Sequence, residues 1–404
     1  MKKTILFIGA PVQGIPGVKL AQKMGLHVVV SDRNPQAPGV KHADDFIQAD
    51  TYNAEETVLK AQQYHQQRPI HGVITLAADV PYTVASVAQA LGLPGIPLKS
   101  AQLAMDKLAM KQQFAADGVR IPWFKAVGSF EALQSAIAEH GYTLIIKPVD
   151  SRGSRGVLRL TSDVDLSWAY EYALSFSPTQ RVMVEKYLEG PQISTESIVI
   201  EGQTYTPGFS DRNYEFIEKY APHIIENGGE LPSHIDPQYQ IAVKDMVGQA
   251  AASMGITQGV VKGDMVVHQG QAYVIEVAAR LSGGFFCTHE IPLNTGVDFV
   301  GAAIKLALGE PVNPDSLQPK YQRHVVQRWI FPKPGVVKSI EDVAAAEQLA
   351  GVEDVVISAK PGDVFKTPVD SCSTAGMVIV TGESRGQALT RAAEAINTIK
   401  VVTA

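Results

Sequence analysis

The first hundred residues alternate short apolar runs with longer amphipathic stretches. Apolar runs and helical patterns succeed one another at residues 4–9, 18–24, 26–32, 54–67 and 72–78. Short β-type runs separated by helical patterns predict a parallel sheet with crossover helices. The turn-rich sequence LGLPGIPLKS follows, so we expect the first α/β domain to end at about residue 98.

The middle of the chain has a different order of elements. A helical pattern at 100–117, with Ser100 as its expected N-cap, leads to the strand TLIIKP, a glycine-containing loop and a further strand. A strand pair then turns around Gly202, a polar segment at 209–233 reads as irregular, and a helix is expected at 237–254. This region ends near Pro319.

After Pro319 the pattern predicts a smaller α+β unit. Its expected strands are HVVQRWIF, VEDVVISA and GMVIVTG, and a helix at 385–396 is expected to close the chain.

A hairpin before residue 284 concentrates charged side chains. A three-residue loop centred on Gly270 would place Asp264 opposite Glu276. Alternation along the second strand places Glu276 and Arg280 on one face and Ile275 on the other. Two facing carboxylates repel each other, and Mg²⁺ relieves that repulsion through oxygen ligands. The pattern therefore predicts a metal site, with a solvated polar strand face as the alternative.

Lys147 and the loop after it form a second polar group. Lys147 lies in an apolar strand, where it must either extend to the strand end or pair with an anion. The loop at 150–156 contains two glycines, two serines and two arginines, so its backbone N–H groups could approach a polyphosphate. A solvated hairpin tip is the alternative, and the loop is not a Walker A motif.

Composition narrows the classes of function. The hydrophobic content of 45% and charged content of 19% are those of a soluble globular protein. A net charge of −6 without a Lys/Arg run argues against a nucleic-acid partner. No apolar stretch is long enough for a membrane span, and Cys287 and Cys372 show no metal or disulfide spacing, so we expect a cytoplasmic protein. GAPVQGIPG lacks G-x-G-x-x-G, so NAD is not expected.

The order of these features resembles the ATP-grasp superfamily across nearly the whole chain. The features are, in order, Lys107, Lys147 with its loop, the segment EKYL at 185–188, Asp264, and Glu276 with Arg280. The resemblance implies a three-part fold of the α/β and α+β classes. Its expected parts are an N-terminal parallel α/β domain at 1–98, an ATP-grasp domain at 99–319 with a lid subdomain at about 121–190, and a C-terminal α+β domain at 320–404.

The same resemblance implies ATP and Mg²⁺ as cofactors, with Mn²⁺ as a substitute for Mg²⁺. The residues implied to bind the nucleotide are Lys107, Lys147, Ser151, Gly153, Ser154, Gly156, Glu185, Lys186, Tyr187, Leu188 and Gln192. Asp264 and Glu276 are the implied metal ligands. Ala278 stands where many members carry Asn, which leaves open whether one or two metal ions bind.

The sequence ARLSGGFF and the C-terminal segments FPKPGVV and KPGDVF resemble the branch of L-amino acid ligases and other carboxylate–amine ligases. That branch implies an acyl-phosphate route that releases ADP and phosphate, with a carboxylate and an amine, such as amino acids, as substrates. Arg280 and Lys147 would be catalytic, and backbone groups of Ser282 and Gly283 would approach the reacting centre. Residues 222–233 resemble a substrate loop.

Three further points stay open. A homodimer is compatible with the resemblance. A bicarbonate-activating enzyme of the biotin carboxylase or carbamoyl-phosphate synthetase type is an alternative function. A non-catalytic ATP-binding regulator is another.

Overall fold

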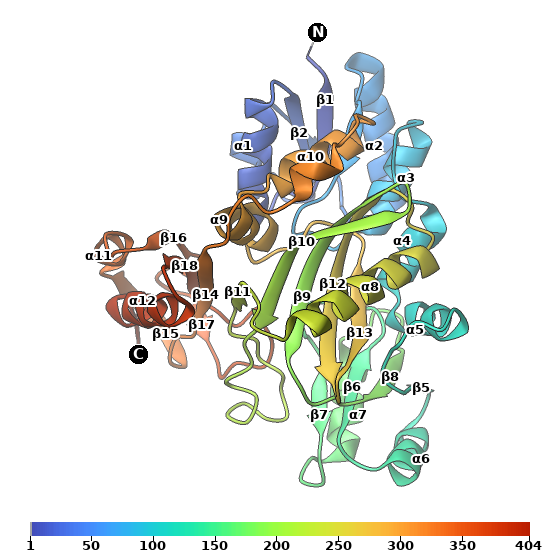
Figure 1. The fold of residues 1–404 in the computed structure, drawn as a ribbon, viewed down its shortest axis with the longest axis vertical. Helices are drawn as coiled ribbons and strands as arrows, with labels where there is room; N and C mark the ends of the chain where they lie inside the picture. The colour runs from blue at the N-terminus through green and yellow to red at the C-terminus, as the bar shows by residue number, and fades with distance from the viewer. Residues whose placement is uncertain (1) are drawn as a thin grey trace.

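The computed structural model describes residues 2–404 (Figure 1). The N-terminal part contains a parallel sheet, as predicted, and the structure gives its strand order as β3-β2-β1-β4. Its strands are β1 (Thr4–Ile8), β2 (His27–Asp32), β3 (Asp45–Gln48) and β4 (Gly72–Ile74), and its helices are α1 (Ile15–Lys23), α2 (Ala54–Gln67) and α3 (Pro81–Ala90). Short buried strands alternate with amphipathic helices here, which is the arrangement that parallel pairing requires.

The single helix predicted at 100–117 is wrong, because two helices occupy this region. They are α4 (Leu98–Met105) and α5 (Lys107–Ala116). Asp106 separates them with an extended backbone, and its carboxylate accepts the backbone N–H of Ala109 as the N-cap of α5. Ser100 is buried inside α4 rather than capping it. The break places Lys107 at the start of α5, where its N–H donates to the carbonyl of Val149 at 2.8 Å.

A four-stranded antiparallel sheet, called the lid sheet below, lies in the segment predicted as a lid subdomain, in the order β5-β8-β6-β7. Its elements are β5 (Phe124–Val127), α6 (Phe130–His140), β6 (Leu144–Pro148), β7 (Leu158–Leu160), α7 (Leu166–Ser175) and β8 (Val182–Lys186). Along β6, Leu144 and Ile146 pack into the lid core, whereas Ile145 and Lys147 line a cavity on the other face. Strand alternation therefore decides that Lys147 faces the cavity.

An eight-stranded sheet joins the middle and the end of the chain, in the order β13-β12-β9-β10-β11-β14-β18-β16. Its strands are β9 (Gln192–Ile200), β10 (Gln203–Arg212), β11 (Gly229–Leu231), β12 (Gly259–His268), β13 (Gln271–Ala278), β14 (His324–Ile330), β16 (Val352–Ile357) and β18 (Gly376–Gly382). Strand β11 lies within the segment predicted as irregular, which corrects that prediction. Strands from before and after residue 319 pair in this one sheet. A domain boundary near residue 319 therefore remains a proposal.

Helices and a small sheet complete the fold. The helices are α8 (Pro237–Ser253), α9 (Ile291–Thr295), α10 (Phe299–Ala307), α11 (Val343–Glu347) and α12 (Arg385–Thr398). The helix predicted to close the chain is followed by β19 (Lys400–Thr403), which pairs with β15 (Gly335–Glu341). Helix α10 packs against α1, beside which it lies in Figure 1, and against β4 of the N-terminal sheet. Within residues 2–404, no helix has the length and apolar character needed to cross a membrane.

Candidate active site

A cavity of about 480 Å³ lies between the lid sheet and the β12–β13 hairpin. It is lined by most of the residues that the sequence singled out. These are Lys107, Lys147, Ser151, Gly153, Ser154, Glu185, Lys186, Tyr187, Leu188, Gln192, Asp264, Glu276 and Arg280. Gly156, Ser282 and Gly283 are not among the lining residues.

The hairpin pairs Asp264 with Glu276, as predicted, but through a different turn. His268 pairs with Gln271, so the loop has two residues, both with positive φ, rather than three. That shorter loop alone would have placed Asp264 opposite Ile275. A β-bulge beyond the pair of Met265 with Val274 adds one residue to β13 and restores the carboxylate pair.

The bulge also changes the position of Ile275. Alternation predicted Ile275 on the face away from Glu276, but both residues line the cavity. The extra residue in β13 interrupts the period of two, so two successive side chains turn to the same side. Val277 packs into the core behind the hairpin, as expected for the opposite face.

Lys147 shares Glu185 with a second buried lysine. The ammonium of Lys147 lies 2.5 Å from one oxygen of Glu185, and that of Lys111 lies 2.8 Å from the other. Burial lowers the pKa of Lys111 to about 8, although Glu185 opposes that change. The two ammonium groups hold the pKa of Glu185 below its usual value in spite of its burial. Two ammonium groups therefore share one carboxylate, and of the three residues Lys147 and Glu185 line the cavity.

Asp264 is surrounded by cations. Arg212 lies 2.8 Å from its carboxylate, and Lys262 contacts the same oxygen. Although burial acts in the opposite direction, Arg212 and Lys262 hold the pKa of Asp264 well below its usual value. Asp264 is therefore ionised and suited to bind a cation. Arg212 also pairs with Glu226, which lines the cavity from the segment after β10.

Lys107 connects the metal side of the cavity to the glycine-containing loop. Its ammonium lies 3.1 Å from Glu276 and donates to the carbonyl of Ser151 at 2.7 Å. Lys107, Glu276 and Ser151 all line the cavity, so an anion bound there would meet the ammonium of Lys107 directly.

Asp79 joins Arg280 to the loop at 150–156. Its carboxylate lies 3.2 Å from Nε of Arg280 and 3.7 Å from Nε of Arg152. Arg152 also stacks over the ring of Tyr52, with 4.6 Å between its guanidinium carbon and the ring centre. Residues of the N-terminal domain therefore hold both Arg280 and the loop.

Ser282 and Gly283 are not on the cavity wall but pack against residues from other parts of the chain, Glu196 and Gln13. The N–H of Ser282 donates to the buried Glu196 at 2.8 Å, and its hydroxyl contacts the same carboxylate. A side chain at Gly283 would lie 2.6 Å from the amide oxygen of Gln13. Glu196 already accepts the hydrogen of the Ser282 N–H, so the approach of the backbone groups of Ser282 and Gly283 to the reacting centre stays a prediction.

One predicted nucleotide residue, Gly156, does not line the cavity, and another, Lys186, lines it with its backbone N–H already engaged. Gly156 has a positive φ and faces Pro148 and Phe176, so it shapes the loop from behind. In the EKYL segment, the N–H of Lys186 donates to Trp123 at 2.8 Å. That N–H is therefore not available to a base in the cavity.

The donor set fits a hard divalent cation. Two carboxylates, Asp264 and Glu276, face one another beside a cavity lined by Lys107 and Lys147, and Mg²⁺ commonly uses one or two carboxylates together with phosphates. Among residues 2–404, no cluster of three or more His, Cys, Asp or Glu side chains could hold a metal alone. Phosphate oxygens would have to complete the coordination.

Sequence reasoning missed Lys111, Asp79, Arg212 and Lys262. Lys111 follows Lys107 by one helical turn, so it lies on the same helix face as Lys107. Lys262 precedes Asp264 by two strand positions, so it lies on the same strand face as Asp264. Asp79 and Arg212 have no such signal, because tertiary packing alone brings them to Arg280 and Asp264.

Three family models match consecutive parts of the chain. An ATP-grasp N-terminal domain model matches residues 18–95, an ATP-grasp domain model matches 104–284, and a model of the L-amino acid ligase C-terminal domain 2 matches 328–404. An uncharacterized protein of Sinorhizobium fredii is 26% identical over 99% of this chain and 83% of its own length. A D-alanine–D-alanine ligase of Gloeobacter violaceus is 30% identical over 46% of this chain and 63% of its own length.

The fold has solved counterparts as well. The L-amino acid ligase of Bacillus licheniformis superposes with a TM-score of 0.82 at 20% identity, over 100% of this chain and 99% of that one. The chain spans less than two thirds of the Gloeobacter ligase, so that enzyme's reaction is not transferred as a whole. The consecutive family matches and the shared fold show that this chain belongs to the ATP-grasp superfamily of ATP-dependent ligases.

Proposed function

We propose that the protein is a carboxylate–amine ligase that activates its carboxylate as an acyl phosphate and releases ADP and phosphate. The observation that supports this most is the convergence of Lys107, Lys147 and Arg280 with the Asp264–Glu276 pair on one cavity. A carboxylate is a poor electrophile, because its charge resists attack and oxide is a poor leaving group. Phosphorylation removes both obstacles.

Each charged residue has a task in this proposal. Lys107 and Lys147 stabilise the charge on the transferred phosphoryl group. Arg280 holds the carboxylate oxygen in line, and Asp79 orients its guanidinium. Asp264 and Glu276 would hold Mg²⁺, which would neutralise phosphate charge when bound.

The loop at 150–156 would limit hydrolysis of the acyl phosphate. Arg152 ties it to Asp79, and the hydroxyl of Ser371 lies 3.3 Å from that of Ser154. A loop held from two sides can keep water from the reacting centre until the amine attacks. Amino acids are the proposed substrates, because Glu226 and the tyrosine ring of Tyr214 line the cavity beside the charged cluster.

Isotope transfer tests the proposal. The protein is supplied with ATP, Mg²⁺, an amine and an ¹⁸O-labelled carboxylate, after amino acids have been screened for phosphate release. We expect ADP as the nucleotide product and label in the released phosphate. AMP as the product, or unlabelled phosphate, contradicts the acyl-phosphate route. Turnover that needs bicarbonate and no amine would support a bicarbonate-activating enzyme instead.

A further inference from the structure

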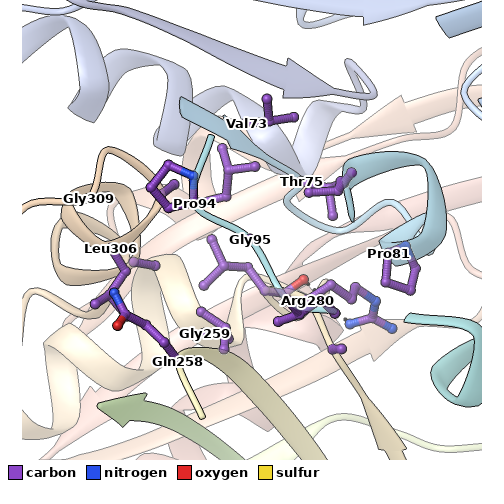
Figure 2. Close-up of a pocket in the computed structure, with 18 residues that line it drawn as sticks. Val73, Thr75, Pro81, Pro94, Gly95, Gln258, Gly259, Arg280, Leu306 and Gly309 are labelled. Atoms are coloured by element: carbon purple, nitrogen blue, oxygen red, sulfur yellow. Dashed lines mark hydrogen bonds between the residues drawn. The ribbon is translucent and has the colours of Figure 1, made fainter. Parts of the chain in front are cut away.

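A second cavity, of about 410 Å³, lies behind Arg280. Figure 2 shows the residues that line it, among them Val73, Thr75, Gly259, Leu306 and Arg280. Arg280 lies at one end beside Pro81, whereas Pro94, Leu306 and Gly309 lie at the opposite end (Figure 2). Its size is within the range of small-molecule sites.

The walls of this back cavity are apolar apart from one cation. Arg280 is the single charged side chain among its described lining residues. The hydroxyl of Thr75 already donates to the carbonyl of Ile8 at 2.8 Å, so it offers no free donor. The amide of Gln258 lies at the exposed rim. A ligand that matches these walls has an apolar body and one acidic group.

The backbone keeps the cavity open. Gly259 has φ of +145°, and a side chain there would lie 3.0 Å from Ile96, which forms part of the wall. Pro94, Gly95 and Gly309 are exposed, so a ligand can enter from solvent without passing through the nucleotide cavity.

Arg280 is the residue that the two cavities share. On the nucleotide side its Nε lies 3.2 Å from Asp79, which also contacts Arg152 of the glycine-containing loop. A carboxylate that reaches Arg280 from the back cavity would compete with Asp79 for the guanidinium. Because Asp79 links Arg280 to the loop, loss of that pair would disturb both the carboxylate site and the loop.

We propose that the back cavity binds a small carboxylic acid with a branched aliphatic or aromatic body, and that this ligand inhibits the enzyme by drawing Arg280 away from Asp79. The binding site does not depend on which substrates the enzyme uses, and only the inhibition rests on the proposed function. A ligand changes a conformational equilibrium only by binding one state better than the other. Here the favoured state is the one in which Arg280 faces the back cavity.

Calorimetry with 4-methylpentanoate tests the site. Val84 lines the cavity from α3, and Val84→Phe would fill it. Gln89→Phe adds the same ring on the exposed side of α3 and is the matched control. We expect saturable binding to the wild type and to Gln89→Phe, and binding about tenfold weaker or absent in Val84→Phe. Ala307→Leu, from α10, repeats the test in case Val84→Phe does not fold.

The neutral amide 4-methylpentanamide tests the role of Arg280, and we expect it to bind about tenfold more weakly than the acid. Equal affinities of acid and amide, no binding to the wild type, or unchanged binding in the folded cavity-filling variants would overturn the proposal.

An activity assay tests the proposed inhibition. Saturating 4-methylpentanoate should lower carboxylate-dependent ATP turnover about five- to tenfold in the wild type but not in Val84→Phe. Unchanged or increased turnover in the wild type would overturn the inhibitory role. If no carboxylate supports turnover, the proposed function fails, whereas the calorimetric result still decides whether the site exists.

Discussion

Asp264 faces Glu276 across the β12–β13 hairpin, and each carboxylate already has a cationic partner from the same cavity. Arg212 pairs with Asp264, and Lys107 pairs with Glu276. We propose that a metal ion and a phosphate chain meet at these two acids.

Asp264→Asn and Glu276→Gln should each lower the rate of Mg²⁺-dependent ATP turnover by at least about 100-fold, because each removes a charged oxygen ligand. Steady-state assays over a Mg²⁺ titration measure this, with unfolding curves to check the fold. Glu201→Gln, at the exposed turn between β9 and β10, is the control. Near-normal rates at saturating Mg²⁺ would exclude the metal assignment.

Lys147→Ala should weaken ATP binding about 10- to 150-fold, since a charge-assisted contact contributes about 1.5–3 kcal/mol. Calorimetry measures the affinity. Lys125→Ala, which removes an exposed lysine of the lid strand β5, should bind ATP like the wild type. An unchanged affinity in Lys147→Ala would place that ammonium away from the phosphates.

Arg280→Ala should depress ligation far more than ATP binding, because Arg280 is proposed to act on the carboxylate in the transition state. We expect kcat to fall about 100-fold or more, with an ATP affinity within about threefold of the wild type. Comparison of single-turnover rates with equilibrium ATP binding separates the two effects. A parallel loss of both would assign Arg280 to the nucleotide instead.

The amides of residues 150–156 should exchange with solvent faster without nucleotide than with it. The loop has little apolar surface to bury, and its ties to Asp79 and Ser371 are polar. Hydrogen exchange followed by mass spectrometry, with and without Mg·ATP, measures the difference. Equal protection in the two states would contradict the lid role.

Glu196 should make stability depend on pH. Burial raises the pKa of its carboxyl from 4.5 to about 7, although Ser282 donates to it. The folded state therefore favours the protonated form, so this stabilisation is complete below pH 4.5 and is lost as pH rises through 7. Relative to Glu196→Gln, the wild type should lose about 3 kcal/mol of unfolding free energy over that interval.

Urea unfolding of the wild type and Glu196→Gln at several pH values measures this difference. Glu201→Gln, at an exposed turn, should follow the pH dependence of the wild type. Curves for Glu196→Gln that stay parallel to the wild type would show that Glu196 does not titrate in this range.

The amino-acid sequence by itself determined the local elements and much of the site's composition. The helix predicted at about 54–67 from its amphipathic pattern is confirmed, and the structure adds that the side chain of Asn53 caps it. The parallel N-terminal sheet followed from alternating apolar runs and helical patterns. The pairing of Asp264 with Glu276 was also predicted, although a shorter turn and a bulge offset one another to produce it.

Tertiary structure alone decided the charge partners. Lys111 of α5 meets Glu185 of β8 only through the tertiary fold, and Asp79 meets Arg280 across about half the chain. Local patterns report which face of an element is apolar, but they contain no information on which distant face it meets. Ser282 shows the same limit. No local pattern indicated a partner for its backbone N–H, and only the tertiary fold brings the buried carboxylate of Glu196 to it.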